Sequence, residues 1–64
     1  MAINNEQAMQ QLEGIKAKAD AHSDPVVSAY YRGIHLGLAE GYWTAGVITC
    51  EQYMQTIEPM RLAA

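Results

Sequence analysis

The sequence predicts a small all-α domain in which a long central helix is flanked by two shorter ones. Three observations lead to this prediction. Apolar residues recur at spacings of three and four, helix-capping residues precede three separate segments, and three glycines fall four residues apart in the middle of the chain. The predicted helices span residues 5–21, 25–45 and 50–58 of one domain, 1–64.

The first helix is expected to start after Asn4, a good N-cap residue, with Gln7 three positions later to complete a capping box. Its apolar positions follow spacings of four, three and four, which is a narrow seam typical of helix–helix packing. They are Ala8, Leu12, Ile15 and Ala19. The other side of this helix is charged and expected to face water.

The start of the second helix has the clearest sequence signal in the chain. Ser23 or Asp24 can cap it, and Pro25 then occupies the first helical position, where its missing N–H costs nothing. Because the connection is so short, the first two helices should fold back as an antiparallel hairpin. At 1.5 Å per residue, the second helix would be about 31 Å long.

The second helix is apolar on most of its circumference. Ser28, Arg32 and His35 form its one polar edge, whereas the remaining surface is dominated by aliphatic, aromatic and glycine residues. A helix of this kind should be buried on more than one side. One partner helix of 17 residues cannot cover it.

The corner after the second helix has the residues of a defined turn. Gly46 suits the position just past a helix end, where a positive φ is common, and Val47 and Ile48 are placed to pack beneath it. Thr49 and Gln52 predict a second capping box.

The third helix is expected to stop at Glu58, since Pro59 disfavours helical backbone at the residue before it. Residues 60–64 would form a tail that can dock through Met60 and Leu62. The apolar side of this helix comprises Tyr53, Met54 and Ile57.

A chain of 64 residues needs additional stabilisation. It buries only about 60% of the surface that its unfolded form exposes, and such chains normally rely on disulfides, a metal or another subunit. One cysteine cannot form an internal disulfide, and two histidines with one cysteine do not match a zinc pattern. We therefore expect a homodimer without cofactor or metal.

The glycines of the second helix are the best candidates for the self-association surface. Three glycines inside a helix cost about 3 kcal/mol relative to alanines, and close approach by another helix is the usual compensation. The predicted self-association residues are Gly33, Gly37, Gly41, Tyr30 and Ile34. Two alternatives remain open: the glycines could receive a bulky side chain of the first helix, or they could open a pocket for a small ligand.

Aromatic residues suggest where another protein would bind, since Tyr and Trp are enriched at the energetic centres of interfaces. Tyr30, Tyr31 and Tyr42 are expected in the core or the self-interface, and Trp43 at the surface.

The predicted partner-binding residues are Trp43, Leu36, Glu40, Arg32 and His35. His35 is interpreted as a surface histidine. A metal pair with Glu40 would need a spacing of three or four residues, and the spacing here is five.

Charge and composition exclude several function classes. The net charge of −3 disfavours nucleic-acid binding, which depends on Lys and Arg contacts to phosphate. The N-terminal residues do not resemble a signal peptide, and the most apolar stretch carries charges that a membrane span would not tolerate. These features and the free Cys50 predict a cytoplasmic protein.

The segment Ala45-Gly46-Val47-Ile48-Thr49-Cys50-Glu51-Gln52-Tyr53 resembles the turn of SHOCT-type short oligomerisation domains and of small helical phage and prophage proteins. A Tyr-x-x-Gly-x-x-x-Gly helix precedes the turn in those proteins, so the resemblance covers residues 30–53. Gln52 stands where those proteins usually have Glu. The resemblance implies an interaction module and a mobile-element origin, and it carries over no functional residue.

The leading functional hypothesis is a protein-interaction module, of a phage-type accessory kind that binds and inhibits or redirects a host protein. One alternative is an oligomer that binds a small ligand or nucleotide between subunits, near Tyr30, Arg32 and His35. Another is a DNA-binding regulator that reads bases with Gln52 and Gln55. We find no catalytic motif and do not expect an enzyme.

Overall fold

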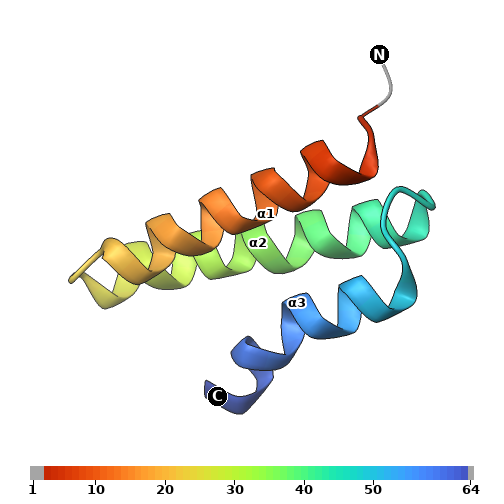
Figure 1. Ribbon diagram of the computed structural model, residues 1–64. Helices are drawn as coiled ribbons and strands as arrows, with labels where there is room; N and C mark the ends of the chain where they lie inside the picture. The colour runs from red at the N-terminus through yellow and green to blue at the C-terminus, as the bar shows by residue number, and fades with distance from the viewer. Residues whose placement is uncertain (1–2, 64) are drawn as a thin grey trace.

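The computed structural model describes residues 3–63, with side chains described for residues 3–58. It contains three α-helices and no strand within that range: α1 (Asn5–Ala21), α2 (Pro25–Thr44) and α3 (Cys50–Ala63). α1 and α2 lie side by side in opposite directions, and α3 turns back to pack on α2 over a shorter stretch (Figure 1). The predicted all-α class and the hairpin of the first two helices are confirmed.

Local side-chain hydrogen bonds fix the starts of α1 and α2. The Asn4 side chain accepts a hydrogen bond from the Gln7 backbone N–H at 2.8 Å, and the Gln7 side chain accepts one from the Asn4 backbone N–H at 3.2 Å. The capping box is therefore present as predicted. Of the two candidates for α2, Asp24 is the cap, and it accepts from the Val26 backbone N–H at 2.8 Å.

The corner between α2 and α3 also follows its predicted chemistry. Gly46 has a φ of 77°, the left-handed conformation that favours glycine, and the next N–H, from Val47, donates to the Tyr42 carbonyl at 2.8 Å. Thr49 and Gln52 form the second capping box, with reciprocal backbone-to-side-chain hydrogen bonds of 3.0 and 2.9 Å. The turn thereby directs Ile48 inward, where its side chain is 3% exposed.

The third helix is longer than predicted. It continues through Pro59 to Ala63, so the expected end at Glu58 and the expected tail from residue 60 are wrong. Proline disfavours helical backbone at the preceding residue, but this is a preference that helices containing an internal proline override. The predicted docking of Met60 and Leu62 lies outside the described side chains.

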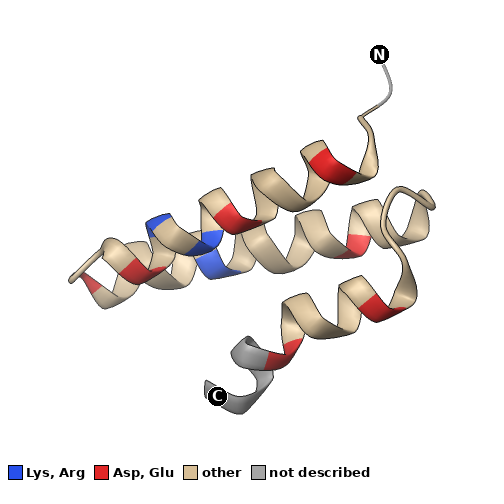
Figure 2. Cartoon of the chain, viewed as in Figure 1, with Lys and Arg blue, Asp and Glu red and all other residues tan. Residues whose placement is uncertain are grey.

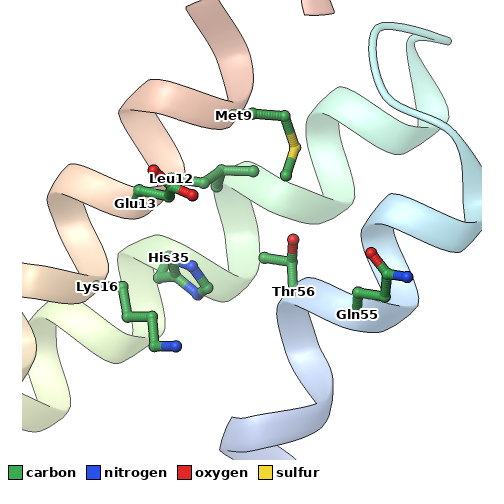
Figure 3. Close-up of a pocket in the computed structure, with 7 residues that line it drawn as sticks. All are labelled: Met9, Leu12, Glu13, Lys16, His35, Gln55 and Thr56. Carbon is green, nitrogen blue, oxygen red and sulfur yellow. The ribbon is translucent and has the colours of Figure 1, made fainter. Parts of the chain in front are cut away.

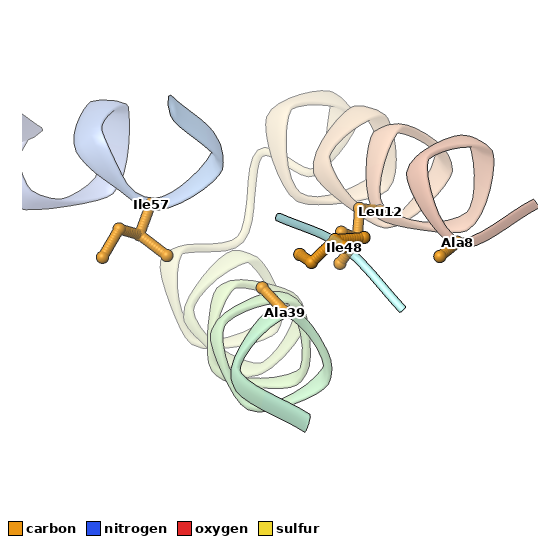
Figure 4. Close-up of a cluster of buried hydrophobic side chains, with 5 residues drawn as sticks. All are labelled: Ala8, Leu12, Ala39, Ile48 and Ile57. Atoms are coloured by element: carbon orange, nitrogen blue, oxygen red, sulfur yellow. The ribbon is translucent and has the colours of Figure 1, made fainter. Parts of the chain in front are cut away.

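The core is small because the molecule is thin. The chain measures 33 × 24 × 14 Å along its principal axes, and Leu12 is the largest side chain that is fully buried. The central hydrophobic cluster is shown in Figure 4 and comprises Ala8, Leu12, Ala39, Ile48 and Ile57. Two of these five residues are alanines, so the contacts between the helices bury little apolar surface of large side chains. Met54, predicted on the apolar side of α3, is instead 45% exposed.

Polar contacts connect the start of α1 to the corner before α3. The Asn5 side-chain amide donates to the Gln52 side-chain oxygen at 2.7 Å and to the Val47 carbonyl at 3.1 Å. The Gln52 amide donates back to the Asn5 oxygen at 3.1 Å. This pairing couples helices that lie far apart in sequence and closes the three-helix arrangement at one end.

Candidate interaction surfaces

The side of α2 that faces α1 and α3 carries two residues of its polar edge, Ser28 and His35. Ser28 and His35 are 7% and 3% exposed, and Ala39 between the same neighbours is 0% exposed. The Ser28 hydroxyl donates a hydrogen bond to the Ala19 carbonyl of α1 at 2.9 Å, so the buried hydroxyl has a hydrogen-bond partner. Small residues on both helices allow this close contact, so Ser28 and His35 are buried, whereas Arg32, the third residue of the polar edge, is exposed.

His35 is therefore not the surface histidine that its sequence context suggested. It lies at the base of a groove of about 200 Å³ between α1 and α3 (Figure 3). The residues that line the groove are Met9, Leu12, Glu13, Lys16, His35, Gln55 and Thr56. With the three helices packed in this way, His35 is buried too deeply to contribute to a flat docking surface.

The environment of His35 favours its neutral form. Burial lowers the pKa of the imidazole below its usual value of 6.5, the positive charge of Lys16 lowers it further, and the negative charge of Asp20 opposes the shift. The folded chain thus binds fewer protons at this position than the unfolded chain. The stabilising contribution is complete above about pH 6.5 and is lost as the pH falls below that value.

The opposite side of α2 faces solvent and is largely apolar. On a helix of 100° per residue, Gly37 lies on the opposite side from Ser28. The side chains of Val26, Tyr30 and Ile34 on this side are 76%, 66% and 37% exposed. Tyr30 is consequently not a core residue of the single chain, whereas Tyr31 and Tyr42 are partly buried. We call this solvent-facing side of α2 the outer face.

Three neighbouring rows of residues, each at four-residue spacing, make up the outer face, and all of their members are exposed. The glycine row comprises Ala29, Gly33, Gly37 and Gly41. On one side of it is the Tyr30 row, which comprises Val26, Tyr30 and Ile34. On the other side is the Leu36 row, which comprises Arg32, Leu36 and Glu40. We call the strip over the glycine row, which lies between two rows of larger side chains, the channel.

The glycines of this channel have no packing role against the other described residues. Apart from its chain neighbours and its own helix backbone, a Cβ atom added at Gly33, Gly37 or Gly41 would meet no described atom within 4 Å. The alternative that they receive a bulky side chain from α1 is therefore wrong. Gly14, on an exposed part of α1, is equally open and provides a matched reference position.

Trp43 lies at the flank between α2 and α3. Its indole stacks on the Tyr53 ring, with centroids 4.5 Å apart and an angle of 14° between the planes. The residue is still 39% exposed, and Leu36, two turns earlier on the helix, is 41% exposed. Both are accessible as predicted. The stack itself was not predicted, because sequence spacing does not indicate which residue of α3 reaches α2.

The structure separates the three residues proposed for a ligand site. His35 is buried between the helices, Tyr30 lies on the outer face, and Arg32 is exposed at the border between them. No group of three His, Cys, Asp or Glu side chains in the described part of the chain is placed to hold a metal ion. Cys50 is an exposed free thiol.

No helix within residues 3–63 is both long enough and apolar enough to cross a membrane. Comparison with known proteins yields no matching family model, no similar curated protein and no similar solved structure. The resemblance of residues 30–53 to SHOCT-type domains therefore stays a prediction.

Proposed function

We propose that this chain is a protein-interaction module that self-associates as a homodimer through the outer face of α2. The observation that carries the proposal is the orientation of α2: Ser28 and His35 are buried within the chain, and a largely apolar side faces outward. Exposed apolar surface of this kind on a small protein marks an interaction site. Only Glu40 and Arg32, at one margin, bring charge to the three rows.

The energetics of the glycine row support a helix as the occupant of this face. Gly33, Gly37 and Gly41 together cost the isolated helix about 3 kcal/mol relative to alanines. The net stability of a domain of this size is only about 3–10 kcal/mol. No contact among the described residues compensates for this helix-propensity cost of the three glycines. Close approach of another helix backbone to the channel would compensate for it.

The limited burial within one chain supports association for a separate reason. The chain exposes 4511 Å², whereas a compact monomer of the same mass exposes about 4,100 Å² by the usual scaling. A second copy is the simplest occupant, because a two-fold axis places the same self-complementary face on both subunits. The dimer would bury both outer faces and thicken the apolar core.

The Trp43–Tyr53 stack is proposed as the contact for a different protein. It lies on the flank of α2 beside α3, at the margin of the outer face. A role in inhibiting or redirecting that partner, as in phage accessory proteins, rests on the sequence resemblance alone.

Light scattering on two leucine variants tests the self-association. Gly37→Leu places a large side chain in the channel and should give a monomer of 7.1 kDa with retained helical circular dichroism. Gly14→Leu, at the equally open position on α1, should keep the mass of the wild type. If both variants keep the wild-type dimer mass, the outer face of α2 is not the interface.

A further inference from the structure

The Leu36 row has a charge pattern that is complementary to itself when reversed. Arg32, Leu36 and Glu40 follow one another at four-residue spacing, so a positive charge, an apolar side chain and a negative charge succeed one another along about 12 Å of helix. All three side chains are exposed. An antiparallel copy of the same row presents the opposite order of charges.

Within the described part of the chain, Arg32 and Glu40 are not paired with each other. They are eight residues apart on α2, so about 12 Å of helix separates them. Neither forms an ion pair with another side chain in residues 3–58. Both charges are therefore available to a partner that approaches the outer face. Figure 2 shows how basic and acidic residues are distributed over the three helices.

The neighbouring glycine row provides the space for this partner. Helices pack by inserting a row of side chains from one into a groove of the other. The channel over Gly33 and Gly37 lies directly beside the Leu36 row, and no side chain among the described residues fills it. Two antiparallel copies can each lay the Leu36 row into the channel of the other.

From this juxtaposition we infer that the α2 helices of two chains pair antiparallel about a two-fold axis near Leu36. This inference rests on the proposed self-association and defines its orientation. Arg32 of each chain then lies beside Glu40 of the other, and the two Leu36 side chains meet between these pairs. In a parallel pair, Arg32 of one chain would instead lie beside Arg32 of the other, and Glu40 beside Glu40. No Arg–Glu pairing would result.

Charge-reversal variants distinguish the antiparallel arrangement from all others. Arg32→Glu leaves two acidic residues, and Glu40→Arg leaves two basic ones, at the ends of the same row. Each variant alone converts both interchain attractions into repulsions, and its dissociation constant should rise about tenfold at low salt. An equimolar mixture of the two variants should form a heterodimer, because both contacts become attractive again.

The double variant Arg32→Glu/Glu40→Arg should likewise return to within about twofold of the wild-type dissociation constant, since the pairing is preserved with reversed signs. Glu13→Arg and Lys18→Glu make the same changes of net charge on exposed positions of α1 and serve as controls. Sedimentation velocity at low and high salt measures all of these species. The differences should shrink at high salt because surface charges are screened.

The results separate the two proposals. If the wild type dimerises but the single reversals match their α1 controls, or if the mixture fails to pair, the antiparallel pairing is wrong and the self-association stands. If the wild type remains a monomer at all concentrations, both proposals are wrong. Rescue by the mixture and by the double variant, together with loss in each single variant, is the result that the antiparallel arrangement predicts.

Discussion

Replacing Gly37 by alanine should have opposite effects on folding and on association. Alanine is favoured over glycine in a helix interior by about 1 kcal/mol. A Cβ at this position meets nothing within 4 Å in the single chain, so no clash offsets the gain. The free energy of unfolding of the monomer should rise by about 1 kcal/mol, which corresponds to about 4–8 °C in melting temperature for a domain of this size.

Association should weaken in the same variant. The helix-propensity gain is present in both the free and the paired subunit, so it cancels from the dissociation constant. The remaining effect on the dissociation constant comes from the methyl group that alanine adds to each channel. Overpacking of a tight contact typically costs about 1–3 kcal/mol. The dissociation constant should therefore rise about five- to 150-fold.

Gly14→Ala is the control for both measurements. Gly14 is exposed within α1 and equally free of neighbours, so its alanine variant should gain about the same stability without any change in association. Chemical denaturation at a concentration where the chain is monomeric gives the first quantity, and sedimentation equilibrium gives the second. Equal stabilisation with an unchanged dissociation constant in both variants would refute the helix contact at Gly37.

Three further predictions concern the fold itself. Thermal melts should show stability falling as the pH drops from 7 to 5, because protonation of buried His35 opposes folding, and His35→Asn should flatten that slope. If His35→Asn leaves the pH dependence of stability unchanged, burial of His35 is not its cause. Gly46→Ala should cost about 1 kcal/mol or more in urea denaturation, since its φ of 77° strains any residue with a Cβ; a neutral result would show that the turn adapts. Thr49→Ala removes the hydroxyl that accepts from the Gln52 N–H and should cost about 0.5–2 kcal/mol, whereas Thr44→Ala, at the end of α2, leaves that cap intact.

Local chemistry explains why so much of the fold could be predicted. Capping residues act within three or four positions, so Asn4, Asp24 and Thr49 define helix starts regardless of the rest of the chain. Gly46 likewise marks a turn through its own backbone freedom. The exception is Pro59, where a local preference is overridden and α3 continues.

The orientation of α2 could not be predicted for a physical reason. Periodicity identifies the buried side of a helix only when one side is apolar and the other polar, and α2 is apolar on most of its circumference. Its inner side is selected by small size, because Ser28 and Ala39 allow close approach to the neighbouring helices. His35 is buried with them and is lost from the predicted partner-binding residues, whereas Arg32, Leu36, Glu40 and Trp43 are exposed.

The mass of the wild-type chain as a function of concentration shows directly whether the outer face of α2 pairs with itself. Sedimentation equilibrium from about 1 μM to 1 mM brackets the affinities expected for a small helical interface. Self-association through the outer face predicts a mass that rises from 7.1 kDa towards twice that value and stays there. A mass of 7.1 kDa across the whole range would show that the exposed apolar side of α2 does not pair with itself.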